Sequence, residues 1–213
     1  MKKPLLLTWI IFIIFLSYDT VAQKTVQLKE VKIGDRIWTL ENLNVDKFRN
    51  GEPIPHAKTE DEWYEATEQK KPAWCYYNND PANAAKYGKL YNWHAVNDPR
   101  GLAPEGWRIP KSEDWNNLIK QYGVNNAINF KSSIGWQEVN GDNKSGFTAY
   151  PGGYRNGLGG FKYLEKAGIW WSSDNKTYKE DNAIVFALYY NLAECTLEPY
   201  PQNNGLSVRC IKE

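Results

Sequence analysis

The residues with the widest chemical range in this 213-residue chain are three cysteines and two histidines. The cysteines are Cys75, Cys195 and Cys210, and the histidines are His56 and His94. A structural zinc site takes four thiolate or imidazole ligands, so nearly all of these residues would have to converge on one point. The sequence contains no CxxC pair and no close cysteine–histidine spacing. It therefore predicts no metal site and no cofactor.

Hydrolytic chemistry has few recognisable signals in the sequence. Acyl transfer needs a nucleophile with a base beside it, and the chain shows no Gly-x-Ser-x-Gly elbow, phosphate loop or dinucleotide fingerprint. Glycoside hydrolysis needs only two carboxylates, and the chain has 25 acidic residues. An extracellular glycan-acting hydrolase that uses paired carboxylates is therefore the alternative function, although no catalytic residue is predicted.

The overall charge argues against nucleic acid as a partner. Lys and Arg number 26 against 25 Asp and Glu, which leaves a net charge of +1. A polyanion binder needs a surplus of cations to release phosphate counterions. The composition is otherwise globular, with 42% hydrophobic and 24% charged residues, and it is rich in rings, with 10 Trp, 14 Tyr and 7 Phe.

The start of the chain has the pattern of a secretory signal. Two lysines open it, an almost wholly apolar run extends from Leu5 to Leu16, and small residues end it at Ala22. A bilayer span needs about 20 apolar residues, so this run is too short. We expect residues 1–22 to be a signal peptide and residues 23–213 to be a mature protein without a membrane span. An uncleaved N-terminal anchor is the competing interpretation.

Three helices are expected, over residues 60–70, 81–87 and 113–122. Thr59 is the expected N-cap of the first, and Glu62 completes a capping box. Ser112 is the expected N-cap of the third, whose apolar residues share one helical face and are expected to lie in the core. These helices occupy the first half of the chain.

Strands are expected mainly in the second half. Residues 26–38 read as a hairpin, and further short strands are expected at 147–150, 161–164, 169–171, 183–190 and 206–211. The segment 183–190 is apolar on both faces, which predicts a central strand covered on both sides. Helices followed by loop-linked strands describe a single α+β domain.

Seven short strings occur in order along the chain. They are IGDRIW with ENLN, YNND, YGKLYNW, LAPEGWRIP, GF with PGGYR, WWSS and SVRC. Together they resemble the Fibrobacter succinogenes major paralogous domain family, which occurs in secreted proteins and lipoproteins of Bacteroidota and fibrobacters. The resemblance extends from about Val31 to the C-terminus. It implies a C-type-lectin-like α+β fold, similar also to formylglycine-generating-enzyme-type domains, with short twisted antiparallel strands, two or three helices and long loops.

The residues within these strings are suited to structural roles. Large rings fill cores, paired glycines permit unusual backbone, and buried guanidinium groups can bond to loop carbonyls. The expected structural residues are Trp107, Trp115, Gly152, Gly153, Arg155, Trp170, Trp171 and Arg209.

The resemblance also bears on ligands. C-type lectins commonly hold calcium through Glu-Pro-Asn or Gln-Pro-Asp with Trp-Asn-Asp, whereas this chain has Glu-Pro-Tyr at 198–200 and Trp-Ser-Ser at 171–173. Calcium-dependent sugar binding is therefore not expected. We expect a secreted or cell-surface module that binds a polysaccharide or a surface protein through loop residues outside the shared strings. The candidate binding residues are Tyr189, Tyr190, Asn191, Asn156, Asp174 and Asn175.

One disulfide is implied by the same resemblance. The family often carries cysteine at the positions of Cys75 and Cys210, and lectin-like domains commonly tie an early helical region to their last strand. A Cys75–Cys210 disulfide with Cys195 as a free thiol is therefore expected. Pairing of Cys195 with Cys210 is the competitor, if the two late strands form a hairpin.

Overall fold

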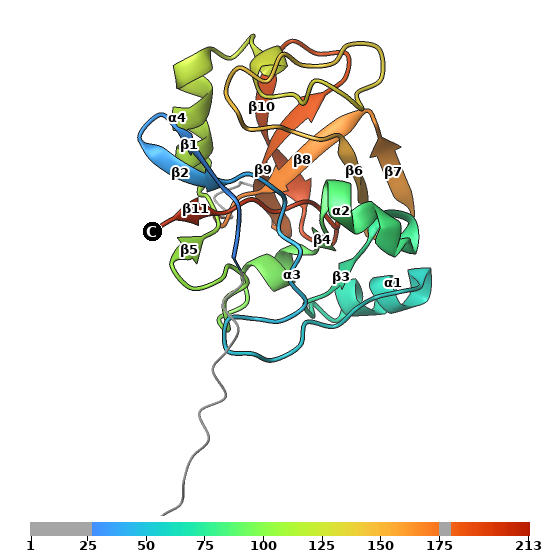
Figure 1. Cartoon of the computed structure of the whole chain (residues 1–213). Coiled ribbons are helices and arrows are strands. Elements are labelled where there is room, and N and C mark those ends of the chain that lie inside the picture. The colour runs from blue at the N-terminus through green and yellow to red at the C-terminus, as the bar shows by residue number, and fades with distance from the viewer. Residues whose placement is uncertain (1–26, 175–179) are drawn as a thin grey trace, which may run out of the picture.

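The computed structural model describes residues 27–174 and 180–213, a mixed α and β arrangement with small antiparallel sheets (Figure 1). The expected signal peptide lies outside the described residues, as does Asn175. Among the helices of the described part, none has the length and apolar character required to cross a membrane. The α-helices there are α1 (Glu60–Glu68), α2 (Ala84–Tyr87), α3 (Trp93–Val96) and α4 (Ser112–Tyr122).

The strands pair in antiparallel fashion throughout the described sheets. Their bounds are β1 (Glu30–Ile33), β2 (Arg36–Thr39), β3 (Trp74–Cys75), β4 (Leu90–Tyr91), β5 (Trp107–Arg108), β6 (Gly152–Arg155), β7 (Phe161–Leu164), β8 (Ala167–Trp171), β9 (Asn182–Tyr189), β10 (Cys195–Pro201) and β11 (Ile211–Lys212). The sheet orders are β1-β2-β11-β5, β10-β9-β8, β3-β4 and β6-β7. The expected α+β class is thus found.

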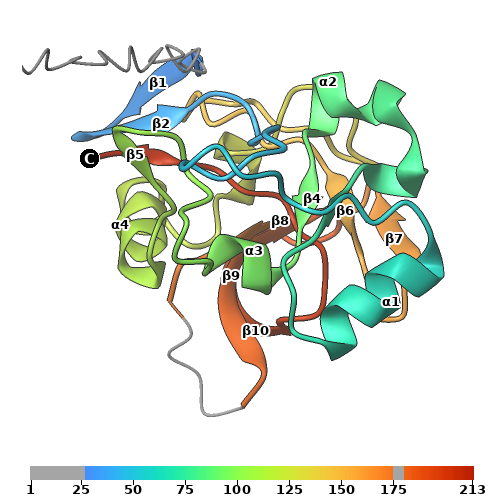
Figure 2. The same ribbon diagram turned by 90° about the horizontal axis from the view of Figure 1, so that it is seen from below.

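The β10-β9-β8 sheet, whose strands can be followed in Figures 1 and 2, separates two large clusters of buried side chains. Alternate residues of β9 point to opposite faces, so Val185 lies in one cluster and Phe186 in the other. On the second face Phe186 stacks on Trp115 of α4, with ring centroids 4.8 Å apart. The predicted central strand at 183–190 is confirmed, because β9 lies between β8 and β10 and is buried on both faces.

Of the predicted N-caps of α1 and α4, the first is confirmed and the second is not. The capping box of α1 is confirmed: the Thr59 hydroxyl accepts from the Glu62 N–H, and the Glu62 carboxylate accepts from the Thr59 N–H, both at 3.1 Å. The predicted cap of α4 is wrong by one residue. Lys111 is the N-cap, and its N–H donates to the Asp114 carboxylate at 2.8 Å, while the Ser112 hydroxyl donates to Asp174.

The expected strands differ from the observed ones in the second half. Residues 147–150 form a loop rather than a strand, and Thr148 within it has a left-handed φ of 53°. Strand β10 was not expected, because Pro199 and Pro201 interrupt its pattern. Proline is tolerated in a strand at a sheet edge, and β10 is the edge strand of its sheet.

The cysteine prediction requires correction. Cys75, Cys195 and Cys210 are all buried free thiols, so neither Cys75–Cys210 nor Cys195–Cys210 is paired. Cys75 lies in a small cluster with Trp63 and Leu90, whereas Cys210 lies in the large cluster on one face of β9. The two thiols therefore pack in different clusters of buried side chains.

Candidate functional site

Four tyrosines from four strands form a contiguous group on the surface, here named the tyrosine cluster: Tyr154 of β6, Tyr163 of β7, Tyr189 of β9 and Tyr200 of β10. Tyr154 stacks nearly parallel on Tyr163, with centroids 5.8 Å apart, and meets Tyr200 edge-on at 5.9 Å. The Tyr189 and Tyr200 hydroxyls lie 3.0 Å apart. The cluster therefore combines aromatic faces with hydroxyl groups.

A carboxylate is held against the tyrosine cluster by strand alternation. Thr196, Glu198 and Tyr200 share one face of β10, because side chains repeat at every second residue of a strand. Glu198 accepts from the Tyr189 hydroxyl at 2.8 Å and from the Thr196 hydroxyl at 3.1 Å. The neighbouring strand presents only the small Ala183 at the position paired with Tyr200, which leaves room for the rings.

Tyr163 occupies an unusual backbone conformation. Its φ is 62° and the residue is 50% exposed. Gly153, on the partner strand, has the same φ, and a Cβ there would lie 2.4 Å from the Lys162 carbonyl oxygen. Left-handed backbone costs an ordinary L-residue about 1–2 kcal/mol. Strain of this kind concentrates at functional sites, so an exposed tyrosine held in it is a functional candidate.

The environment raises the pKa of three tyrosines of the cluster, Tyr154, Tyr189 and Tyr200. Burial, together with Glu198 nearby, raises the pKa of Tyr200 to about 12. Burial raises the pKa of Tyr189 still further, with the Tyr200 hydroxyl and Glu198 as additional causes. The pKa of Tyr154 is also raised by burial. These hydroxyls therefore stay neutral and can donate hydrogen bonds throughout the physiological pH range.

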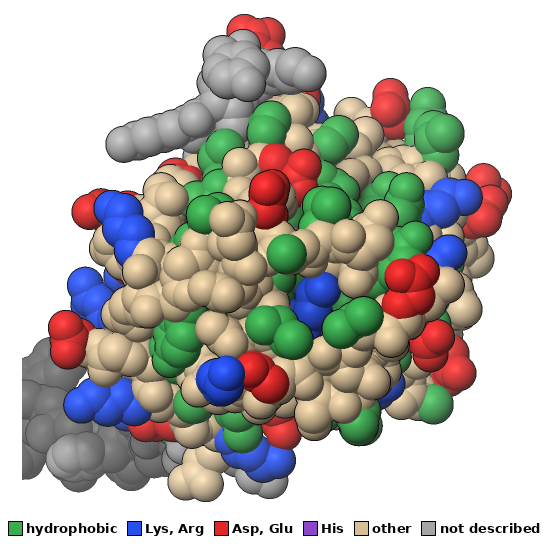
Figure 3. All heavy atoms as spheres, turned by 90° about the horizontal axis from the view of Figure 1, so that it is seen from above, with side chains coloured by type: hydrophobic (Ala, Val, Ile, Leu, Met, Phe, Trp, Pro, Cys, Tyr) green, Lys and Arg blue, Asp and Glu red, His purple; other side chains and the backbone are tan. Residues whose placement is uncertain are grey.

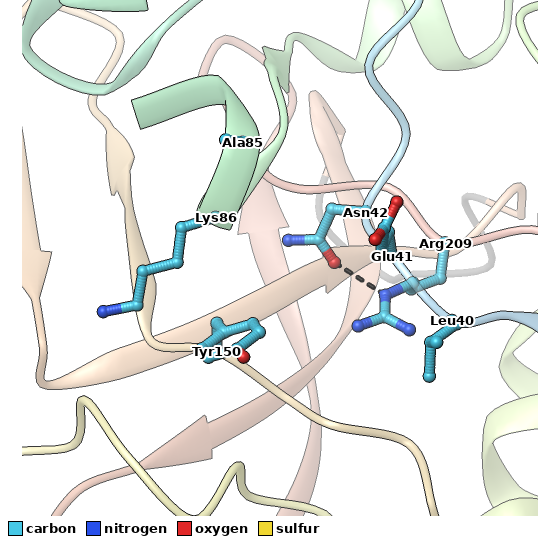
Figure 4. Close-up of a pocket in the computed structure, with 7 residues that line it drawn as sticks. All are labelled: Leu40, Glu41, Asn42, Ala85, Lys86, Tyr150 and Arg209. Carbon is cyan, nitrogen blue, oxygen red and sulfur yellow. Dashed lines mark hydrogen bonds between the residues drawn. The ribbon is translucent and has the colours of Figure 1, made fainter. Parts of the chain in front are cut away.

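A separate pocket of about 300 Å³ lies between α2 and the segment that follows β2 (Figure 4). It is lined by Leu40, Glu41, Asn42, Ala85, Lys86, Tyr150 and Arg209. Glu41 is its one carboxylate and forms an ion pair with Lys29 at 2.7 Å. The Arg209 guanidinium lies beside the Asn42 amide, as the dashed line in Figure 4 marks.

Paired carboxylates suited to glycoside hydrolysis are not found in this pocket. Such chemistry places two carboxyl groups about 5–10 Å apart, one of them protonated. Glu52 and Asp98 do share a neighbour, since Arg100 contacts them at 2.7 and 2.8 Å. The Arg100 guanidinium lowers the pKa of Asp98, which is the opposite of what a catalytic general acid requires.

The two histidines do not form a catalytic arrangement with a nucleophile. The His56 ring stacks on the Trp74 ring, with centroids 3.8 Å apart. Burial lowers the pKa of both His56 and His94. Within residues 27–174 and 180–213, no hydrogen bond joins either imidazole to a serine or cysteine side chain. The described residues likewise contain no group of three or more His, Cys, Asp or Glu side chains placed to hold a metal ion.

Of the six residues predicted for binding, the structure brings Tyr189 into the tyrosine cluster. Tyr190 packs on the opposite face of the sheet, and Asn191 is exposed at the turn after β9. Asn156 accepts from two loop N–H groups, and Asp174 accepts from the Ser112 N–H and hydroxyl. Asn175 lies outside the described residues.

Sequence reasoning missed Tyr154, Tyr163, Tyr200 and Glu198. The available signal was the alternation of Thr196, Glu198 and Tyr200, which is typical of a strand with one polar face. The intervening Pro199 obscured that signal. No comparable pattern links β6 or β7 to β10, because their association is tertiary.

The residues expected to be structural are largely buried, and several bond to loop backbone. Trp171 donates its indole N–H to the Tyr91 carbonyl and Trp170 to the Asn42 side chain, both at 2.8 Å. Arg155 and Arg209 are fully buried and donate to carbonyl oxygens. The Trp115 indole N–H is buried without a hydrogen-bond partner. The remaining members, Trp107, Gly152 and Gly153, are also buried.

The face shown in Figure 3 carries acidic, basic and hydrophobic side chains interspersed, without a large region of one charge sign.

Comparison with known proteins gives one match, between residues 31–212 and the profile of the Fibrobacter succinogenes major domain. No curated protein and no solved structure matches the chain.

Proposed function

The chain belongs to the Fibrobacter succinogenes major domain family, and from the surface it presents we propose that it is an extracellular binding module that recognises a polysaccharide through the tyrosine cluster. The secretory pattern of the N-terminal sequence supports the extracellular location. The C-type-lectin-like character of the fold is part of the same proposal. It draws support from the mixed arrangement of short strands, helices and long loops.

The observation that carries this proposal is the half-exposed ring of Tyr163, held in a strained backbone and stacked on Tyr154. The apolar face of a sugar ring buries surface favourably against such an aromatic plane. Beside it, Tyr189, Tyr200 and Glu198 form a hydrogen-bonding edge that suits sugar hydroxyls. The combination of a flat ring and a polar edge favours a polyhydroxylated ligand.

A surface protein is the other partner that such a module could take. A stable protein complex buries about 800 Å² on each partner around a packed apolar centre. The tyrosine cluster is polar at its edge and supplies one half-exposed ring, which favours a sugar. A hydrolase is disfavoured because the pocket contains one carboxylate.

The proposal is tested by screening the purified protein against immobilised polysaccharides while released sugars are measured. Binding without release is expected. Release of sugars would support the hydrolase instead, and binding to cell-surface proteins but to no polysaccharide would overturn the choice of ligand.

Replacing Tyr163 by alanine should weaken binding to the polysaccharide identified in this screen at least about tenfold, which corresponds to about 1.4 kcal/mol. The loss follows from removal of the exposed stacking face. Tyr64→Ala is the matched control, since Tyr64 on α1 is 46% exposed and makes no ring contact with the tyrosine cluster in the described part of the chain. Equal losses in both variants, measured by isothermal titration calorimetry, would contradict the assignment.

Tyr163→Gly should leave the free energy of unfolding nearly unchanged while it weakens binding as much as Tyr163→Ala does. Glycine relieves the left-handed strain of about 1–2 kcal/mol, and removal of the ring forfeits a stacking contact of about 0.5–1.5 kcal/mol. Urea denaturation measures the balance. A loss of more than about 3 kcal/mol would show that Tyr163 serves stability rather than binding.

A further inference from the structure

The Glu198 carboxylate beside the tyrosine cluster is hydrogen-bonded through one of its two oxygens. The Tyr189 and Thr196 hydroxyls both donate to Oε1, at 2.8 and 3.1 Å. Oε2 accepts a hydrogen bond from none of the residues that the structure describes, and it is not one of their buried unpartnered atoms, so it is accessible to solvent. A carboxylate has about four acceptor positions, so Glu198 can accept further hydrogen bonds from a ligand.

The hydroxyl protons around Glu198 are already committed. Tyr189 has one hydroxyl proton, and it is donated to the carboxylate, which as a charged acceptor forms the stronger hydrogen bond. The Tyr200 hydroxyl, 3.0 Å away, must therefore donate to the Tyr189 oxygen. Thr196 also donates to Glu198. What this edge offers to a ligand is acceptors, namely Glu198 Oε2 and the Tyr200 oxygen, and a matching ligand has to supply the donors.

The negative charge of Glu198 has no counter-charge within residues 27–174 and 180–213. No ion pair joins Glu198 to a lysine or arginine there. No cation of those residues lies over a ring of the tyrosine cluster either, Lys162 included, although it is the register partner of Tyr154. A positively charged donor therefore gains a Coulombic attraction that a neutral hydroxyl does not, and an acidic sugar is repelled.

We propose that the tyrosine cluster binds a polysaccharide with protonated amino groups, the ammonium of one amino sugar lying against Glu198 Oε2 and the Tyr200 hydroxyl oxygen. An ammonium supplies three N–H donors and no acceptor, which complements an edge that offers acceptors only. A neighbouring sugar of the same chain would stack on the exposed ring of Tyr163. The preference for an amine follows from Glu198 and its surroundings, whereas a sugar as the carrier of the amine rests on the proposed function.

The test compares three hexasaccharides of the same linkage by isothermal titration calorimetry of the purified protein at neutral pH: the glucosamine hexamer, the N-acetylglucosamine hexamer and cellohexaose. The glucosamine hexamer should bind about fivefold more tightly than cellohexaose, as expected for one partly screened charge pair, and high salt should reduce this preference. Equal affinities, or tighter binding of the acetylated hexamer, would overturn the proposal. Hexalysine bound as tightly as the glucosamine hexamer would refute a sugar as the carrier of the amine.

Glu198→Gln should remove the preference, so that the glucosamine hexamer and cellohexaose bind with equal affinity. Glutamine keeps an oxygen that can accept from Tyr189 and Thr196 but has no charge. Glu105→Gln is the matched control, because it makes the same charge change at an exposed position in the loop before β5 and should leave the preference intact. Equal loss of preference in both variants would reduce the effect to overall charge and refute the site.

Failure of this inference is distinguishable from failure of the proposed function. Tyr163→Ala should weaken the binding of all three hexasaccharides and leave the preference for the amine unchanged, because stacking does not depend on charge. If Tyr163→Ala weakens binding but the wild-type protein shows no preference, the proposed function stands and the amine site is refuted. If the preference depends on Glu198 while Tyr163→Ala has no effect, the amine site stands and the stacking surface is refuted.

Discussion

Replacing Arg155 by alanine should lower the free energy of unfolding by about 3 kcal/mol, a large share of the 5–15 kcal/mol typical of a domain. Arg155 is fully buried in β6 and donates to the carbonyls of Ala57, Thr59 and Gly159 at 2.6–2.9 Å. These bonds join residues up to 98 positions apart in the sequence. Each buried carbonyl left without a donor costs about 1–3 kcal/mol, and relief from burying an unpaired charge offsets part of that cost.

Arg155→Met separates the hydrogen bonds from the packing. The guanidinium lies between Trp63 and Phe161, 4.9 and 4.8 Å from their ring centroids. Methionine keeps most of the apolar stem between these rings and lacks donors. It should therefore recover a minor part of the loss seen with alanine.

Arg36→Ala is the control for the Arg155 variants, since Arg36 is exposed on β2 and its loss should cost less than about 0.5 kcal/mol. Urea denaturation of the four proteins measures the differences. Full recovery in Arg155→Met would show that packing, rather than carbonyl bonding, is the source of stability.

Raising the pH above 9 should destabilise the protein steeply, by about 3 kcal/mol for each further pH unit. Burial raises the pKa of Cys75, Cys195 and Cys210 from 9.0 to about 12. The unfolded chain releases these protons from pH 9 upward and the folded chain holds them to about pH 12, so the unfolded state gains about 1.4 kcal/mol per thiol per pH unit. Below pH 9 this contribution is fully retained.

Arg209 has the opposite effect to the thiols on the pH dependence of stability in the same pH range. Burial lowers its pKa in the folded state to about 9, so the folded chain loses this proton where the unfolded chain keeps it. The Arg209 contribution has the opposite sign and about the size of one thiol's contribution. The net slope of the unfolding free energy against pH is therefore that of about two thiols. Titration of Tyr200, whose pKa is raised from 10.0 to about 12, adds to the destabilisation above pH 10.

Cys195→Ala isolates one thiol in this pH dependence. The slope of unfolding free energy against pH between 9 and 11, measured by urea denaturation in reductant, should become shallower by about 1.4 kcal/mol per pH unit. The slope is the diagnostic quantity, because a cavity lowers stability equally at every pH. An unchanged slope would contradict the titration of a buried thiol, and a Cys75–Cys210 linkage in non-reducing peptide maps would contradict the free thiols.

The features that the sequence determined by itself are local. The capping box of α1 is encoded within four residues, Thr59 to Glu62, and forms wherever that segment becomes helical. The hairpin of β1 and β2 turns at Gly34, whose φ of 59° a glycine adopts without strain. The central position of β9 was predictable because its side chains are apolar on both faces.

The tertiary structure alone decided the candidate site and the pocket. Tyr154 and Tyr200 meet only because β6 and β10 pack together, and Arg209 meets Asn42 across 167 positions of sequence. The Arg209 position also depends on Trp170, which bonds to the same amide. Caps and turns follow from hydrogen bonds within a few residues, so residue types predict them. Contacts between distant segments arise from how whole strands pack, and that information is spread over the entire chain rather than written beside any one residue.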